Sequence, residues 1–496
     1  MNTFPKIIVA FFATAILSTA GCGGGGGGGD TPPPTTPPPT TPPPTGGITG
    51  SGVAVGPITG FGSVIVNGVT YDTSSATFTK DGQSATQDDF SVGQVVVVKG
   101  SVDDNGTNAT ADSVEFDDVV EGPVSSHNTT TGEFVVLGQT VRIVPTTSFD
   151  DTPACPADLT QAVAVEVSGL ADANGVIEAT RIECRDAATW DGVLEVNGLV
   201  SGHNAGAQTF MINALEVDYS GAAVDNFPTG IINDGDPVEA KGTAFDGTTL
   251  DATRVEYKGN RFATDDGDFG EIEGFITRFV SASDFDVSGI PVTTTASTTF
   301  EGGAAADLGL NLKVEVDGNF NASGVLVATK VDIKSATAVR VTGTLDSVSG
   351  NTLTILGITV NTDPLKTRFE DKSDADIDPL RVGDLVSGNY VEIRGQEQPV
   401  GQITAVLLER DDADSRTELR GFVEVGGKNE PNLTVLGVTI VTDGGTQYRD
   451  SRGATDVVMT PAAFWAAVQE GSLVDARGTE SGDTTLAATE LELQMD

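Results

Sequence analysis

The 496-residue sequence is poor in basic residues, histidine, cysteine and aromatic side chains. It contains 27 lysines and arginines against 71 aspartates and glutamates, so its formal net charge is −44. Cationic contacts to phosphates supply most of the non-specific affinity of a protein for nucleic acid, and carboxylates repel the same backbone. We therefore expect no nucleic-acid partner. The sequence also contains neither the P-loop nor the dinucleotide-binding glycine motif.

An apolar run near the start of the sequence is too short to span a bilayer. It covers residues 7–17, follows one basic residue and has eleven residues, where a membrane-spanning helix needs about 20. It predicts a secretory signal peptide over residues 1–21. The segment ends in Ser18-Thr19-Ala20-Gly21-Cys22, which resembles a bacterial lipobox although threonine stands where the motif prefers leucine. The resemblance implies acylation of Cys22, and the alternative is an ordinary secreted protein cleaved nearby.

Residues 22–52 are too rich in glycine, proline and threonine to pack a core. Seven glycines follow Cys22, and residues 32–44 hold blocks of three prolines separated by threonines. Glycine runs form flexible coil, whereas polyproline extends by about 3.1 Å per residue. We expect a disordered tether that lifts the rest of the chain off the membrane. Because Gly23 is not the aspartate that retains many lipoproteins at the inner membrane, we expect an outer-membrane lipoprotein of the bacterial envelope, either periplasmic or surface-exposed.

The remaining two cysteines point to an oxidising compartment. Cys155 and Cys184 have neither a C-x-x-C spacing nor a histidine partner that would indicate a metal site. Secreted proteins commonly oxidise such a pair. We expect a disulfide bond between them.

Six imperfect repeats follow the tether. A glycine before two β-branched or apolar residues recurs at spacings of 66 to 78 residues. These glycines are Gly56, Gly122, Gly198, Gly274, Gly343 and Gly421. We place the repeats at residues 53–120, 121–190, 191–265, 266–336, 337–414 and 415–496, and we expect each to fold as a weakly coupled unit.

Each repeat has the strand pattern of a small all-β domain. A strand, a glycine turn and a second strand follow the repeat glycine, as in residues 353–360, and two further strands end the unit. A short helix is predicted between these halves in the last repeat, with Thr460 as its cap and Gly471 at its end. Three strands, a helical turn and two strands are typical of a closed OB-like β-barrel, and an open sandwich or β-roll is the alternative.

The repeated pattern resembles a bacterial family known as domain of unknown function 5666. The glycine and hairpin motifs that carry the resemblance recur over nearly all of residues 53–496. The family is often found in tandem on lipoproteins with glycine- or proline-rich starts. The resemblance implies tandem β-domains on a lipoprotein, and it brings no established activity or catalytic residue.

Few residues stand out as candidates for chemistry. His127 and His203 each follow a repeat glycine by five residues, which fits a polar turn better than a metal or acid–base pair. Asp265, Asp266 and Asp268 offer oxygen ligands suited to Ca²⁺ but lack the spacing of a calcium loop. We interpret this cluster as a solvated linker, with a Ca²⁺ site as the alternative.

Both tryptophans are interpreted as packing residues. Trp465 lies on the predicted helix, where the core is the expected environment, and Trp190 lies in a connector between repeats. A ligand platform is the alternative for each.

The sequence thus favours a non-enzymatic, lipid-anchored envelope protein without a cofactor. Its membrane contact would be the N-terminal lipid, and its role would be structural, adhesive or the binding of a protein, glycan or peptide. The first alternative is a module that binds divalent cations or cationic partners through its acidic surface. A hydrolase is the second alternative, but no pair of carboxylates is marked by its spacing.

Replacing Cys22 by serine should abolish the incorporation of labelled palmitate into the full chain expressed in bacteria, because the cysteine thiol is the group that receives the lipid. The label is measured on the purified protein, and Cys155→Ser serves as a control that keeps it. Labelling that persists in Cys22→Ser contradicts the lipoprotein interpretation.

Overall fold

The computed structural model describes residues 50–102, 108–129, 131–150, 154–186, 190–259, 264–334, 339–397, 401–452 and 457–494. The predicted signal peptide, Cys22 and the predicted tether up to residue 49 lie outside these residues. Within the described part of the chain, no helix has the length and apolar character needed to cross a membrane.

The fifth repeat shows how each unit closes. The strand β26 (Val339–Ser349) pairs antiparallel with β27 (Thr352–Ile355), which pairs antiparallel with β28 (Ile358–Asn361). Strand β28 then runs parallel to β31 (Gln402–Asp411), and β31 pairs antiparallel with β30 (Tyr390–Glu397). Strand β30 returns to β26 and closes the barrel. This is the strand order of an OB barrel, which confirms the predicted fold class.

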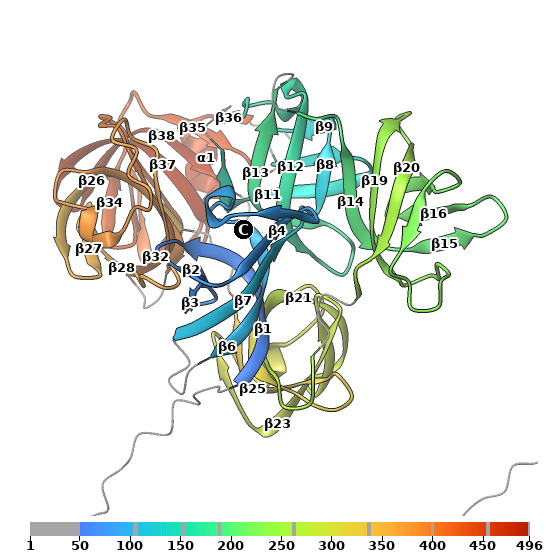
Figure 1. The fold of residues 1–496 in the computed structure, drawn as a ribbon. Helices are drawn as coiled ribbons and strands as arrows, with labels where there is room; N and C mark the ends of the chain where they lie inside the picture. Colours follow the sequence, from blue (N-terminus) through green and yellow to red (C-terminus); the bar gives the residue numbers. More distant parts are fainter. Residues whose placement is uncertain are drawn as a thin grey trace, which may run out of the picture. The chain divides into compact units, whose positions relative to one another are not determined.

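The other units repeat this order (Figure 1). Repeat 1 uses β1 (Gly50–Gly60), β2 (Val64–Val66), β3 (Val69–Asp72), β6 (Val95–Val102) and β7 (Asn108–Phe116). Repeat 4 uses β21 (Phe269–Ser281), β22 (Asp284–Val287), β23 (Ile290–Glu301), β24 (Lys313–Phe320) and β25 (Leu326–Ile333). Repeat 6 uses β32 (Thr417–Asn429), β33 (Asn432–Val435), β34 (Val438–Val441), β37 (Leu473–Gly482) and β38 (Thr485–Leu493).

In repeats 2 and 3 the first strand is interrupted. Repeat 2 uses β8 (Val120–Gly122), β9 (Val124–Asn128), β10 (Glu133–Val136), β11 (Gln139–Phe149), β12 (Ala164–Ala171) and β13 (Ile177–Arg185). Repeat 3 uses β14 (Leu194–Leu199), β15 (Ser201–Asn204), β16 (Thr209–Ile212), β17 (Leu215–Asp218), β19 (Pro237–Phe245) and β20 (Thr249–Tyr257). Short additional strands are β4 (Thr77–Lys80), β5 (Gln83–Ala85), β18 (Ala223–Asp225), β29 (Arg368–Asp371), β35 (Gln447–Asp450) and β36 (Val457–Met459).

The predicted helix is present as α1 (Pro461–Ala467), with the hydroxyl of Thr460 accepting a hydrogen bond from the Ala463 amide at 3.3 Å. Its Phe464 and Trp465 are buried, so Trp465 is a core residue as expected. At the same place, four other repeats have a single 3₁₀ turn. These turns are Gln87–Asp89, Leu159–Gln161, Ala305–Asp307 and Val382–Asp384.

The hairpin between the second and third strands depends on two consecutive left-handed residues. Leu356 and Gly357 have φ angles of 51° and 74°, and Leu436 and Gly437 have 50° and 76°. A leucine rarely adopts positive φ, but both leucines here are almost fully buried. Burial in the barrel core therefore holds a turn that the backbone alone disfavours.

The six barrels are joined in pairs through their first strands, and the weak coupling expected from the sequence stays a prediction. Strand β1 runs parallel to β21, strand β8 runs antiparallel to β14, and strand β26 runs antiparallel to β32. The pairing makes three continuous sheets, which hold repeats 1 and 4, repeats 2 and 3, and repeats 5 and 6. We call these junctions seam 1–4, seam 2–3 and seam 5–6.

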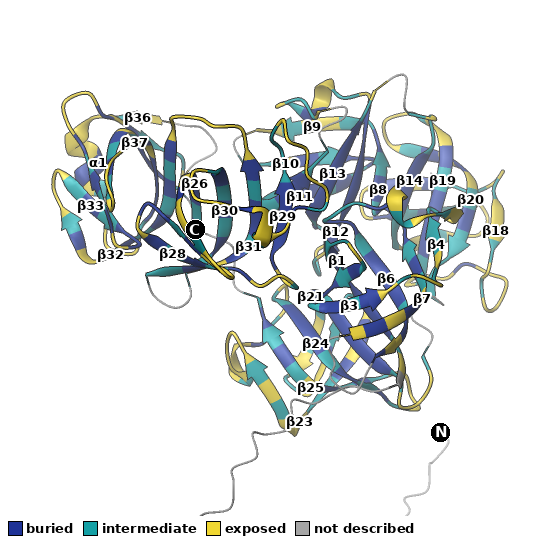
Figure 2. Ribbon diagram, turned by 60° about the vertical axis from the view of Figure 1, so that its left-hand side comes forward, coloured by how far each residue is buried: buried dark blue, intermediate teal, exposed yellow. Residues whose placement is uncertain are grey.

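Buried and solvent-facing positions alternate along the strands (Figure 2). The inward side chains are apolar, and they fill each barrel with a core of valine, leucine, isoleucine and phenylalanine. Repeat 2 is further closed by a disulfide bond between Cys155 and Cys184, which confirms the predicted pairing.

Candidate functional site between the paired barrels

Several charged residues on the outer face of the barrel strands are buried rather than exposed. The fourth strand of most repeats carries a carboxylate three residues before a glycine. These residues are Glu166, Glu239, Glu315, Glu392 and Asp475, and all of them except the half-buried Glu392 are exposed by 3% or less. Because apolar and polar residues alternate along these strands, the sequence predicted that one face of each strand contacts solvent. Pairing between barrels and neighbouring chain segments cover that face instead, so its carboxylates need partners inside the protein.

Seam 5–6 matches its carboxylates with arginines. Arg340 donates to Asp475 at 2.8 Å and also to Glu418, and Arg477 donates to Glu418 at 2.9 Å. Burial raises the pKa of Asp475 to about 7, and Glu418 adds to the effect. Each buried carboxylate at this seam therefore has a cationic neighbour.

A pocket of about 600 Å³ opens beside seam 5–6. Its lining includes Arg340, Arg394 and Arg420, which stand side by side on three neighbouring strands. Arg477, the carboxylates of Asp475 and Glu492, and residues within 129–149 of repeat 2 also contribute to the lining. Like charges opposite each other on paired strands repel. The pocket is therefore a place where an anionic group would find cationic side chains in an otherwise acidic protein.

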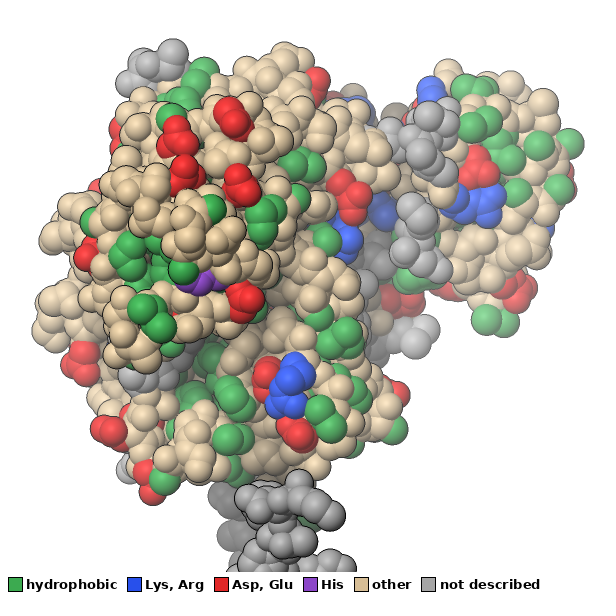
Figure 3. Space-filling model, turned by 90° about the vertical axis from the view of Figure 1, so that its right-hand side faces the viewer, with side chains coloured by type: hydrophobic (Ala, Val, Ile, Leu, Met, Phe, Trp, Pro, Cys, Tyr) green, Lys and Arg blue, Asp and Glu red, His purple; other side chains and the backbone are tan. Residues whose placement is uncertain are grey.

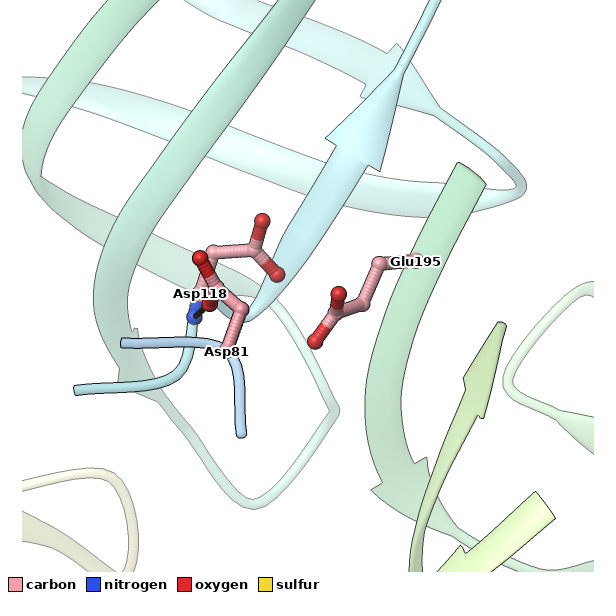
Figure 4. A group of neighbouring side chains, drawn as sticks. All are labelled: Asp81, Asp118 and Glu195. Carbon is pink, nitrogen blue, oxygen red and sulfur yellow. Dashed lines mark hydrogen bonds between the residues drawn. The ribbon is translucent and has the colours of Figure 1, made fainter. Parts of the chain in front are cut away.

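Seam 2–3 contains a group of converging carboxylates (Figure 4). Asp81 follows β4, Asp118 lies between β7 and β8, and Glu195 is on β14. One carboxylate oxygen from each side chain lies within 4.8 Å of the others. We call this group the carboxylate centre.

Backbone hydrogen bonds hold the carboxylate centre in place. The Asp118 amide donates to Asp81 Oδ1 at 3.2 Å, and the side-chain amide of Asn197 donates to the Asp118 carbonyl at 2.5 Å. The Asn197 amide donates to the Val119 carbonyl at 2.9 Å. These bonds fix the connector between repeats 1 and 2 against β14.

Several carboxylate oxygens of the centre lack hydrogen-bond donors among the described residues. Both side-chain oxygens of Asp118 and Oε1 of Glu195 are buried and accept no hydrogen bond from the part of the chain that the structure describes. Burial raises the pKa of Asp118 and Glu195 well above the usual carboxyl value, and it also raises that of Asp81. Nearby carboxylates add to the shift for Asp118, since Glu195 and Asp81 repel its charge.

Lys241 is the main cation at the carboxylate centre. Its Nζ lies 2.5 Å from Glu195 Oε2 and 3.5 Å from Glu239, and it donates to the Asp81 carbonyl at 3.2 Å. These carboxylates raise the pKa of Lys241 against the effect of its burial. One ammonium thus faces several carboxylates, so the centre can take up a further cation or a proton.

Two neighbouring carboxylate groups have more cations. Asp118 also lies near Glu121 and Glu166, which Arg185 contacts, and Lys80 lies 3.4 Å from Glu166. Burial raises the pKa of Glu121 to about 7, and Arg185 opposes the shift.

In the second group, beside seam 1–4, Glu271 meets Glu315 and Asp317. Lys330 lies 3.4 Å from Asp317, and Lys334 lies 2.9 Å from Glu315. Lys330 also lies 3.6 Å from Glu301, and Lys334 lies 2.7 Å from Asp332, so these two ammoniums are shared with further carboxylates.

The metal or acid–base pair that was the alternative for His127 and His203 is not formed, because the two side chains have separate partners. His127 accepts a hydrogen bond from the Leu159 amide at 3.1 Å, and His203 bonds the Tyr219 hydroxyl at 2.6 Å. Each histidine thus has a hydrogen-bond partner within its own barrel, which agrees with its interpretation as a polar turn residue.

The aspartates suggested for Ca²⁺ form a turn. Asp268 accepts from the Asp265 amide at 2.7 Å and from the Ser51 hydroxyl at 2.5 Å, while Asp265 and Asp266 are exposed. None of them belongs to the carboxylate groups that converge among the described residues. Cation binding at this turn stays a prediction.

Exposed carboxylates are scattered on the face shown in Figure 3, where acidic side chains are separated by polar and apolar ones. The convergent carboxylates lie in the seams instead. Sequence reasoning missed them because Asp81 precedes a turn glycine, Asp118 lies in a connector and Glu195 alternates with apolar residues as if it faced water. The sequence held one signal of the carboxylates in the seams, which is a glutamate three residues before the repeat glycine. This glutamate is Glu195, Glu271 and Glu418 in repeats 3, 4 and 6.

Comparison with known proteins supports the repeat architecture. The sequence model of the Domain of unknown function (DUF5666) matches residues 55–115, 121–183, 273–332, 342–409 and 420–492. The chain belongs to the DUF5666 family. Repeat 3 is outside these matches but has the same strand order as the other DUF5666 repeats. A search of curated proteins finds no match.

In cation-free buffer, the free energy of unfolding should rise as the pH falls from about 8 to about 5. The pKa values of Asp118 and Glu195 are raised in the folded state, and that of Glu121 is about 7. Between these values and the ordinary carboxyl pKa near 4, the folded state binds protons that the unfolded state has released, so protonation favours folding. Urea unfolding of the full chain measures the trend.

The variant Asp118→Asn should be more stable than wild type at about pH 8, and its stability should depend less on pH, because it lacks the buried charge. A wild-type stability that falls steadily from pH 8 to 5 contradicts this account of the seam.

Proposed function

We propose that this DUF5666 chain is a non-enzymatic, lipid-anchored protein of the bacterial outer membrane that serves as a structural array. Its barrels would be presented to a protein, glycan or peptide partner in the periplasm or at the cell surface. The observation that carries the proposal is the pairing of first strands, which joins separate barrels into continuous sheets. Such joints make a chain of small domains stiffer than flexible linkers would.

The burial of the convergent carboxylates supports a non-enzymatic role. A glycosidase needs two carboxylates on opposite sides of a substrate in an open cleft. Asp118 and Glu195 are 1% and 2% exposed, so a polymeric substrate would not reach them. Their surroundings fit a structural junction better than a reaction site.

The arginine-lined pocket beside seam 5–6 suggests how a partner could be held. Arg420 Nε is buried there and donates to no hydrogen-bond acceptor among the described residues. A guanidinium is well suited to a carboxylate group on a glycan or peptide. The pocket thus favours a partner that carries acidic groups.

Arg340→Ala should lower the local stability of both repeat 5 and repeat 6. Removing one partner of a buried ion pair leaves the other charge uncompensated, which typically costs about 3–5 kcal/mol. Hydrogen exchange of the full chain, read by mass spectrometry, should therefore rise at β26 and at β32, while the other two seams keep their protection. The control Arg452→Ala removes a solvent-accessible pair with Asp450 and should change little. Increased exchange confined to repeat 5 contradicts a paired structural unit.

A further inference from the structure

The carboxylate centre holds more negative charge than its cations neutralise. Asp81, Asp118 and Glu195 converge there, and the ammonium of Lys241 contacts Glu195 and the Asp81 carbonyl. Lys241 is also shared with Glu239. The neighbouring Lys258 does not relieve the deficit, because it lies 2.8 Å from Asp117 and 3.4 Å from Glu239.

Several carboxylate oxygens of the centre are buried without a hydrogen-bond donor among the described residues. Asp118 is 1% exposed, and neither of its carboxylate oxygens accepts a hydrogen bond from the described residues. Glu195 uses Oε2 for Lys241 and leaves Oε1 buried and unpaired. In Figure 4 the side chains of Asp81, Asp118 and Glu195 extend into the same space from three different segments. A buried carboxylate left without a partner is costly, so this space calls for a positive ligand.

We propose that Asp81, Asp118 and Glu195 bind a divalent cation of the Ca²⁺ type at seam 2–3. All three donors are carboxylate oxygens, which hard cations prefer, whereas zinc and copper sites are usually built with histidine or cysteine. Glu195 would bind the cation through its Oε1 atom and keep its Oε2 atom on the ammonium of Lys241. Water molecules would complete the coordination shell of an ion held by three side chains.

The position of the centre gives the cation a structural role. Asp81 belongs to a turn of repeat 1, Asp118 to the connector between repeats 1 and 2, and Glu195 to the first strand of repeat 3. A bound cation would thus tie repeat 1 to the barrel pair at seam 2–3. It would stabilise the folded chain because the unfolded chain does not bring these residues together.

The other two carboxylate groups fit this role less well. Arg185 contacts Glu121 and Glu166, so the group that they form with Asp118 has a guanidinium in place. Glu315 is within 3.8 Å of both Lys330 and Lys334 in the group beside seam 1–4. The group beside seam 1–4 thus has contacts from two ammoniums, whereas Lys241 is the ammonium in contact with the carboxylate centre, which makes the centre the better site for a divalent cation.

Calorimetric titration of the full chain with CaCl₂ at neutral pH and constant ionic strength tests the proposal. Wild type should give a saturable isotherm, and Asp118→Asn and Glu195→Gln should each lose one site or weaken it by at least about tenfold. Asp475→Asn is a matched control, because it removes a buried carboxylate that Arg340 compensates. A triple change of Asp265, Asp266 and Asp268 to asparagine is a second control at an exposed cluster. Both controls should keep the isotherm.

Circular dichroism and thermal unfolding with EDTA show that the variants are folded. Asp118→Asn should melt at or above the wild-type temperature without cation, and added Ca²⁺ should stabilise it no more than NaCl of matched ionic strength does. If Asp118→Asn does not fold, Glu195→Gln decides the result. The absence of a saturable wild-type isotherm, an isotherm that is unchanged in Glu195→Gln, or a loss confined to the triple variant would overturn the proposal.

Discussion

Each first strand has one free hydrogen-bonding edge, and the rest of the architecture depends on how that edge is satisfied. In β26, residues 339–344 pair with β30, whereas residues 345–349 pair with β27. The barrel therefore leaves the second edge of the first segment open. Residues 340–342 use it to pair with β32 of the next barrel. An open strand edge invites uncontrolled association, and pairing between barrels of the same chain removes it.

Edge pairing changes what the outer face of the strands must accommodate. Residues that would contact water on an isolated barrel become buried, among them Glu195 and Asp475. Burying a charge costs free energy unless a partner compensates it, and even a good ion pair roughly balances its own desolvation. Seam 5–6 meets this requirement with Arg340 and Arg477. At seam 2–3, Arg185 contacts Glu121 and Lys241 contacts Glu195, but both carboxylate oxygens of Asp118 stay without a hydrogen bond from the described residues. The same fold thus produces a neutralised junction in one pair and an acidic one in another.

The barrel itself could be predicted from the sequence because its determinants are local. Alternating strands, the Leu356-Gly357 turn and the Thr460 cap each act within a few residues. The disulfide bond followed from having two cysteines beyond Cys22.

The partners of the barrels could not be predicted in this way. Nothing in the pattern around Gly56 indicates that β1 pairs with β21, more than 200 residues away, because edge pairing depends on the three-dimensional fit of finished barrels. The carboxylate centre was hidden for the same reason. Asp81, Asp118 and Glu195 lie far apart in the sequence, and each has an ordinary local explanation as a turn, a connector or a solvent-facing strand position.

A cysteine cross-link across seam 1–4 tests edge pairing most directly. Ala54 on β1 stands opposite Glu271 on β21 in the parallel register. In the full chain carrying Ala54→Cys and Glu271→Cys, mild oxidation should join these two positions, and mass spectrometry of the digested protein should identify the linked peptides. A control chain with Ala54→Cys and Glu195→Cys should give no such link. If the first pair stays as free thiols in folded protein, or if the control pair links equally well, the barrels are not joined through their first strands.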